Sequence, residues 1–93
     1  MIVTELAKIK IEELIKAPKE VMPDQMFFLR VTAIEDDGIK YQTYFDYERR
    51  SDDTLIRFEG FDLRIDSESL KYLDSATLDY NEEQGFILDH SNT

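Results

Sequence analysis

The side chains of this sequence that are best suited to chemistry are carboxylates. Asp36 and Asp37 stand together before Gly38, and a further acidic residue, Asp89, precedes the only histidine, His90. Carboxylate oxygens bind hard divalent cations such as Mg²⁺, Mn²⁺ and Fe²⁺, and histidine adds a nitrogen ligand. The residues therefore permit a divalent metal site. They equally fit a solvated acidic turn, because adjacent aspartates before a glycine are common turn formers.

Other kinds of reaction chemistry lack the residues that they need. The 93 residues include no cysteine, so they offer no thiolate for nucleophilic catalysis or for zinc and iron–sulfur sites. No serine lies in a Gly-x-Ser-x-Gly string, and no glycine-rich loop precedes a predicted helix. No spacing of carboxylates selects an acid and a base. We therefore expect a protein that is not an enzyme.

The charge balance bears on partners. The sequence holds 21 acidic and 11 basic residues, for a formal net charge of −10. Such a surface repels phosphate backbones and anionic membranes, so we expect neither nucleic acid nor membrane as a partner. No apolar run approaches the roughly 20 residues that span a bilayer, and residues 1–10 do not look like a signal peptide. A single cytoplasmic domain, residues 1–93, is expected.

The hydrophobic pattern predicts a helix followed by strands. Thr4 is a candidate N-cap of a helix that we expect to end at Pro18. Its apolar stripe is formed by Ala7, Ile11, Leu14 and Ile15. From Met26 onward the period becomes 2, which predicts strands with one face in the core and the other partly in solvent. The expected elements after Met26 are strands at 27–33, 39–46, 54–58, 61–65, about 78–80 and about 86–88, and a helix at 68–73 capped by Ser67. Glu59 and Gly60 are expected to form a tight hairpin between the strands 54–58 and 61–65.

These elements define the expected fold class. It is a β-rich α+β fold of short, mostly antiparallel strands, arranged as a sandwich or partly open barrel. An N-terminal helix and a short helix near residues 67–73 complete it. The acidic residues of the loops, Asp52 and Asp53 among them, are expected to be solvated.

Several residue strings resemble those of a known family, the A-type iron–sulfur cluster carriers, also called HesB-like proteins. The similarity runs from about Leu29 to Thr93. The strings that carry it are Gly38-Ile39-Lys40-Tyr41 with Phe45-Asp46, Asp52-Asp53, Phe58-Glu59-Gly60-Phe61, Asp66-Ser67-Glu68-Ser69-Leu70-Lys71-Tyr72-Leu73, and Leu78-Asp79-Tyr80 with Gly85-Phe86. The resemblance implies a HesB-like fold and a link to iron–sulfur cluster assembly.

The resemblance also implies a ligand set that this sequence does not contain. Proteins of the family hold iron or a cluster with three cysteines. The first of these positions falls on Asp36, and the sequence ends at Thr93, before the other two would be reached. We therefore expect an accessory or protein-interaction module with no cofactor of its own. The alternative is a carboxylate-based protein that binds or donates divalent iron, because the family brings this loop and the tail together. Its ligands would be Asp36, Asp37, Asp89 and His90.

Aromatic residues suggest where a partner could bind. Alternate residues of a strand face opposite sides, so Tyr41 and Phe45 on one face of the 39–46 strand leave Tyr44 on the other. Exposed tyrosines are common anchors in interfaces. We therefore expect Tyr44 to contact a protein partner or a second subunit, although a singly exposed aromatic residue is also an ordinary surface feature.

Overall fold

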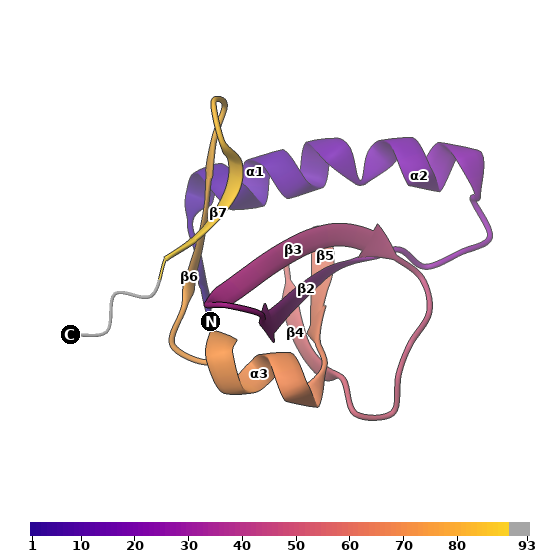
Figure 1. Ribbon diagram of the computed structural model, residues 1–93. Helices are drawn as coiled ribbons and strands as arrows, with labels where there is room; N and C mark the ends of the chain where they lie inside the picture. The colour runs from indigo at the N-terminus through magenta and orange to yellow at the C-terminus, as the bar shows by residue number, and fades with distance from the viewer. Residues whose placement is uncertain (90–93) are drawn as a thin grey trace.

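The computed structural model describes residues 1–89. Figure 1 shows the elements in chain order. They are β1 (Ile2–Val3), α1 (Glu5–Leu14), α2 (Lys16–Val21), β2 (Phe28–Glu35), β3 (Ile39–Asp46), β4 (Thr54–Phe58), β5 (Phe61–Ile65), α3 (Ser67–Leu73), β6 (Thr77–Asn81) and β7 (Gly85–Asp89). The expected α+β class, rich in short strands, is confirmed.

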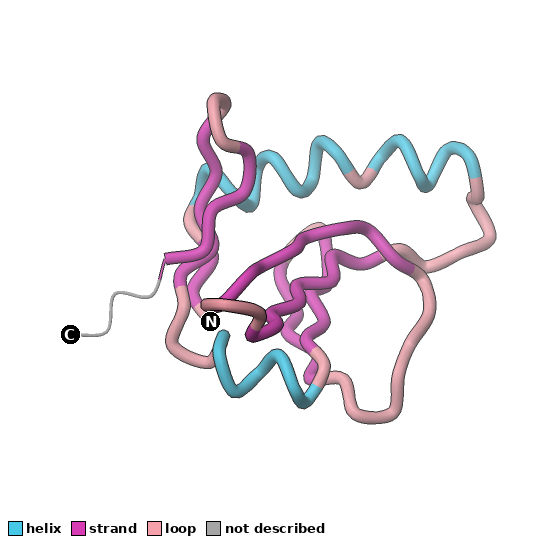
Figure 2. The backbone as a smooth tube through the Cα atoms, in the orientation of Figure 1, coloured by secondary structure: helices cyan, strands magenta, loops and turns pink. Residues whose placement is uncertain are grey.

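The strands form two open sheets. The larger has the order β3-β2-β5-β4 and the smaller the order β1-β6-β7. Pairing is antiparallel except between β2 and β5 and between β1 and β6. Figure 2 shows the helices α1 and α2 end to end along one side of the strands and α3 on the opposite side. The sequence did not predict β1, because two residues are too few to show a period.

The core lies between the large sheet and the helices. Its buried members from the sheet are Leu29, Val31, Ala33, Phe61, Leu63 and Ile65, and those from elsewhere are Val3, Ala7, Ile11, Ile15, Leu73, Ala76 and Leu78. The alternation along β2 and β5 therefore has the predicted inward face. The stripe on α1 has it too, except for Leu14, which was predicted to face the core but is 38% exposed. Burial of these apolar side chains supplies most of the force that holds the layers together.

The first helix was expected to end at Pro18, and that prediction was wrong. Helix α1 ends at Leu14, and α2 then runs from Lys16 to Val21 with Pro18 as its third residue. A proline is tolerated there because the first N–H groups of a helix have no partner within the helix. The predicted cap of α1 is confirmed, since the Thr4 hydroxyl accepts a hydrogen bond of 3.2 Å from the N–H of Ala7.

Two of the predicted turns are present, and each contains a glycine. Asp37 and Gly38 adopt φ values of 54° and 108°, the left-handed region that the Asp-Asp-Gly string favours. Glu59 and Gly60 join β4 to β5 in the predicted hairpin. The short helix α3 is also present, but its N-cap is Asp66 rather than Ser67, because the Asp66 carboxylate accepts from the Ser69 N–H.

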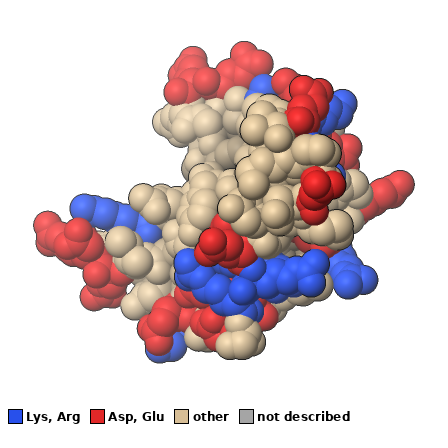
Figure 3. All heavy atoms as spheres, turned by 90° about the vertical axis from the view of Figure 1, so that its right-hand side faces the viewer, with Lys and Arg blue, Asp and Glu red and all other residues tan. Residues whose placement is uncertain are grey.

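The surface charge is unevenly distributed. Figure 3 shows Lys and Arg side chains as a band across the lower part of one face, with Asp and Glu scattered around it. Arg49 and Arg50 belong to the 47–53 loop between β3 and β4, at the right in Figure 1. The absence of a nucleic-acid partner stays a prediction. Within residues 1–89, no helix has both the length and the apolar character needed to cross a membrane.

Candidate functional site

The acidic turn between β2 and β3 is open to solvent. The side chain of Asp36 is 70% exposed, and its carboxylate accepts a 3.4 Å contact from the ammonium group of Lys40. The backbone closes the turn tightly, because the Asp36 N–H donates to the Gly38 carbonyl at 2.7 Å. The turn is thus formed by its backbone, and its carboxylates project outward.

The remaining residues of the predicted metal set lie on the smaller sheet. Asp89 is the last residue of β7, opposite Thr77 of β6, and His90 lies outside the described residues. Among residues 1–89, no three acidic side chains gather in a way that could hold a metal ion, so Asp36, Asp37 and Asp89 do not form such a group. The metal site that includes His90 stays a prediction.

Tyr44 lies on the outward face of β3, as predicted. It stands opposite Arg30 in the pairing with β2, and it is 40% exposed. Because β3 is an edge strand of the large sheet, Tyr44 is accessible from outside. That it contacts a partner or a second subunit stays a prediction.

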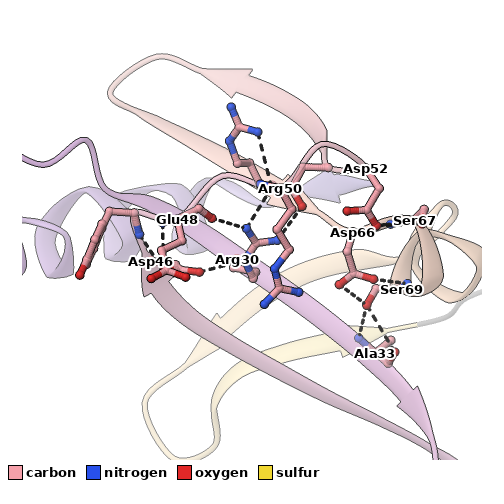
Figure 4. A network of polar contacts seen from close by, with 12 residues as sticks. Arg30, Ala33, Asp46, Glu48, Arg50, Asp52, Asp66, Ser67 and Ser69 are labelled. Carbon is pink, nitrogen blue, oxygen red and sulfur yellow. Dashed lines mark hydrogen bonds and ion pairs between the residues drawn. The ribbon is translucent and has the colours of Figure 1, made fainter.

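The most highly organised polar site was not predicted, and its centre is Arg30. This side chain projects from the middle of β2 and is fully buried. Its guanidinium donates to both carboxylate oxygens of Asp53, at 2.7 and 2.9 Å, to the carboxylate of Asp46 at 3.1 Å and to the carbonyl of Glu48 at 2.8 Å (Figure 4). Arg30 therefore holds both ends of the 47–53 loop. The expectation that this face of β2 is partly in solvent was wrong for this reason.

Asp53 is the main acceptor of this site. Its side chain is fully buried, and it also accepts from the Arg50 N–H at 3.0 Å and contacts the Arg64 guanidinium at 3.5 Å. The hydrogen bonds from Arg30 hold the pKa of Asp53 below its usual range, against the opposing effect of burial. The prediction that Asp53 is solvated was therefore wrong.

The second carboxylate, Asp46, is held in a similar way. Burial alone would raise the pKa of Asp46, but the N–H groups of Glu48 and Tyr47, together with Arg30, outweigh it and lower that pKa. In turn, Asp53 and, to a smaller extent, Asp46 raise the pKa of Arg30, against the opposing effect of burial. Every charge in this cluster has a partner, which is the condition for charged groups to be buried at all.

An aromatic ring completes the cluster. Phe28 is buried, and the guanidinium carbons of Arg30 and Arg64 lie 5.2 and 5.3 Å from its ring centroid. These distances are typical of cation–π contacts, which become stronger away from water. The sequence held one signal of this site: Arg30 is the single charged residue between Met26 and Ile34, and its neighbour on the same face of the strand, Phe28, is apolar.

A second chain of hydrogen bonds fixes α3. The Asp52 carboxylate accepts from the N–H and the hydroxyl of Ser67, at 3.1 and 2.9 Å. In the same region the buried hydroxyl of Ser69 accepts from the Ala33 N–H at 2.9 Å and donates to Asp66 at the same distance. Figure 4 shows these contacts beside the Arg30 cluster. They tie the 47–53 loop and the end of β2 to one helix.

The two hydrogen-bonded groups hold structure in place and do not look like a catalytic centre. The guanidinium nitrogens of Arg30 and the carboxylate oxygens of Asp53 already form hydrogen bonds within the protein. A nucleophile, general acid or metal ligand would need a lone pair or proton free to face a substrate. What the arrangement can do is present the surrounding loops and edges in one fixed geometry.

The fold is similar to that of two solved structures. The chain superposes on the Escherichia coli protein SufA, described as involved in biosynthesis of iron–sulfur clusters, with a TM-score of 0.79 over 99% of this chain and 81% of that one. A structure of IscA with a [2Fe-2S] cluster matches with a TM-score of 0.75 over 98% and 85%. At 22% and 21% sequence identity, these two matches establish the fold of A-type carriers.

Sequence similarity identifies the family. No family model matches this chain. The iron-sulfur cluster insertion protein ErpA of Marinobacter nauticus is 39% identical over 79 residues, which cover 85% of this chain and 70% of that protein. ErpA of Francisella tularensis subsp. novicida is 38% identical over 82 residues, covering 86% and 67%. The chain belongs to the A-type iron–sulfur cluster carrier family, which includes the ErpA proteins.

Proposed function

We propose that this chain is a non-catalytic member of the family that acts as an accessory, protein-binding module in iron–sulfur cluster assembly. In this proposal it does not ligate a cluster with its own side chains. The observation that carries the proposal is the residue at position 36. The resemblance places the first cysteine there, but the chain has an exposed aspartate that contacts Lys40. A carboxylate is a hard ligand, whereas iron–sulfur clusters are held by soft thiolates.

The buried framework around Arg30 supports a binding role. The cluster of Arg30, Asp53 and Asp46 keeps the loop after β3 in place although the 93 residues supply no thiolate. A scaffold that presents fixed loops can still recognise a protein that handles clusters. The cluster would then be the cargo of that partner, and this chain would act without a resident cofactor.

Anaerobic reconstitution tests the first part of this proposal. The purified protein is incubated with Fe²⁺ and sulfide, desalted and examined by visible absorption, with IscA, whose structure contains a [2Fe-2S] cluster, treated in parallel as the positive control. We expect no absorption band at about 400 nm from this chain, because it has no thiolate. A stable band with stoichiometric iron and sulfide would contradict the proposal.

A pull-down from native lysate tests the accessory role. The tagged protein is used as bait, and the captured proteins are identified by mass spectrometry against a bait of similar size and charge. We expect enrichment of iron–sulfur assembly proteins. Capture only of proteins unrelated to cluster assembly would show that the scaffold alone was kept.

A further inference from the structure

Helix α1 carries apolar side chains on two sides. Ala7 and Ile11 are fully buried against the core, as expected for an amphipathic helix. Leu6 and Ile9 point the other way and remain 63% and 60% exposed. We call these two residues the α1 ridge. Leu6 and Ile9 lie three residues apart, on the same side of the helix, so their exposed side chains form one apolar strip that a partner could contact.

A groove lies on each side of the α1 ridge. The first, of about 440 Å³, separates the helix from the β4–β5 hairpin, and its lining includes Ile9, Phe58 and Gly60. The second, of about 260 Å³, separates it from the β6–β7 hairpin, and its lining includes Leu6, Ile9 and Tyr80. Ile9 belongs to both grooves. Apolar side chains of a partner could therefore enter on either side of the ridge.

The two cations of this surface are already engaged. The ammonium group of Lys8 lies 5.5 Å from the centroid of the Phe58 ring and 3.4 Å from the carboxylate of Glu5. That of Lys10 lies 5.2 Å from the centroid of the Tyr80 ring and 3.4 Å from the carboxylate of Glu13. Each lysine thus lies against a groove wall next to its own carboxylate.

The remaining carboxylates give the surface around the two grooves a net negative charge. Glu12, Glu59 and Glu82 line the two grooves, and within residues 1–89 they form no ion pair. The grooves together hold five carboxylates and two lysines. Complementary charge favours a basic partner. A second copy of this acidic surface would bring like charges together, which disfavours self-association through the α1 ridge.

We propose that the α1 ridge and its two grooves bind a basic amphipathic segment of a partner protein. Apolar side chains of that segment enter the grooves beside Leu6 and Ile9, and its lysines or arginines pair with Glu12, Glu59 and Glu82. This is a common mode of helix-in-groove recognition. The inference rests on the proposed function, because it gives a location and a chemistry to the protein-binding role.

The test uses a defined probe. A fluorescein-labelled peptide built from repeats of Lys-Leu-Leu-Lys is titrated with the full chain and followed by fluorescence anisotropy, and a matched Glu-Leu-Leu-Glu peptide serves as the control. We expect the basic peptide to bind and the acidic peptide not to bind. The double variant Leu6→Gln plus Ile9→Gln should bind about tenfold more weakly, the loss expected when two partly exposed apolar contacts are removed.

A control variant distinguishes specific binding at the α1 ridge from non-specific binding to exposed apolar residues. Val21 of α2 is 79% exposed and lines neither groove, so Val21→Gln should bind like the unmodified chain. The variant Glu59→Lys plus Glu82→Lys should weaken binding and reduce its dependence on salt. Amide shifts in ¹H–¹⁵N spectra should concentrate on α1 and the tips of the two hairpins.

Three results would overturn the inference. The first is equal binding by the unmodified chain and the Leu6→Gln plus Ile9→Gln variant, which would show non-specific electrostatic attraction. The second is concentration-dependent dimerisation that this variant abolishes, which would make a second copy the occupant. The third is no binding of the basic peptide. None of these results alters the reconstitution spectrum or the pull-down, so failure here is distinguishable from failure of the proposed function.

Discussion

Two aspartate pairs flank β3, and the fold uses them in opposite ways. Asp36 and Asp37 precede the strand in a tight turn, and the side chain of Asp36 is 70% exposed. Asp52 and Asp53 follow it in the 47–53 loop, and the side chain of Asp53 is fully buried beside Arg30. The two pairs have the same composition, and both lie in polar loops. The difference between them comes from a cation on another strand.

The comparison shows how a carboxylate gains a structural role. Asp53 is held by two guanidinium hydrogen bonds and one backbone N–H, all of which fold with the loop. Asp36 has only a flexible lysine four residues away, and exposed pairs of that kind contribute little to stability. The fold therefore does not depend on the carboxylate of Asp36, whereas it does depend on that of Asp53.

Removing Arg30 should have the largest effect. Arg30→Met removes the main donor of the buried Asp53 carboxylate and one donor each of the partly buried Asp46 carboxylate and Glu48 carbonyl, so we expect the free energy of unfolding to fall by about 3–5 kcal/mol. Urea unfolding followed by circular dichroism measures this loss. Arg30→Lys keeps the positive charge but cannot donate to both oxygens of Asp53 in the same geometry. Its stability should therefore lie between those of the unmodified chain and Arg30→Met. A loss below about 1 kcal/mol for Arg30→Met would show that the cluster does not stabilise the loop.

Neutralising one aspartate of each pair tests the comparison directly. Asp53→Asn keeps the shape but loses the charge that faces Arg30, so we expect unfolding to become easier by about 1.5–3 kcal/mol. Asp36→Asn, the matched control in the exposed pair, should change the free energy of unfolding by less than about 0.5 kcal/mol. Equal losses from the two substitutions would end the distinction between the pairs.

Acid should weaken the buried cluster. The pKa values of Asp53 and Asp46 are lowered in the folded protein, so as the pH falls the unfolded chain takes up protons first. The stability contributed by these carboxylates is complete above their unfolded pKa of about 3.9 and is lost as the pH falls through their folded values. Urea unfolding at a series of pH values should show this decline. Asp53→Asn should flatten it, and an unchanged slope would contradict the assignment.

The backbone of the exposed turn should matter more than its carboxylates. Gly38 has φ of 108°, and an alanine there would meet strain although no atom lies within 4 Å of its added methyl group. We expect Gly38→Ala to cost about 1 kcal/mol in thermal or urea unfolding. Asp37, at φ of 54°, should accept Asp37→Gly with little change. If Asp37→Gly destabilised the protein more than Gly38→Ala, the side chain of Asp37 would have a role that this structure does not explain.

The smallest expected effect concerns metal. Because Asp36, Asp37 and Asp89 form no group that could hold a metal ion, we expect calorimetric titration with Mg²⁺, Mn²⁺ or anaerobic Fe²⁺ to show no specific binding at millimolar concentration. The matched variant is Asp36→Ala plus Asp37→Ala. Binding that this variant abolished would restore the carboxylate site that includes His90.

The predictions from sequence were best where neighbouring residues decide the structure. The Asp-Asp-Gly turn, the Glu59-Gly60 hairpin and the Thr4 cap each depend on a few adjacent residues, and all three are present. The strands β2 and β3 were equally clear from their period of 2. Pro18 misled because a proline can end one helix or lie in the first turn of the next, and periodicity does not separate these cases.

The buried cluster was missed because its parts are far apart in the sequence. Arg30 lies 16 residues from Asp46 and 23 from Asp53, and local patterns do not connect them. The only signal in the sequence was that Arg30 is the single charged residue between Met26 and Ile34, since a cation buried in so apolar a strand needs a partner. The partner could not be chosen, because the sequence offers 21 acidic residues.

By itself, the sequence determined the α+β class, most of the strands and turns, the lack of thiolate ligands and the family resemblance that the comparisons confirmed. These depend on residue type, period and short strings, which act locally. The tertiary structure decided that the side chain of Asp53 is buried, that the 47–53 loop covers Arg30, and that Leu6 and Ile9 are left exposed between two grooves. These depend on which distant surfaces meet, and that is settled only when the two sheets and three helices pack together.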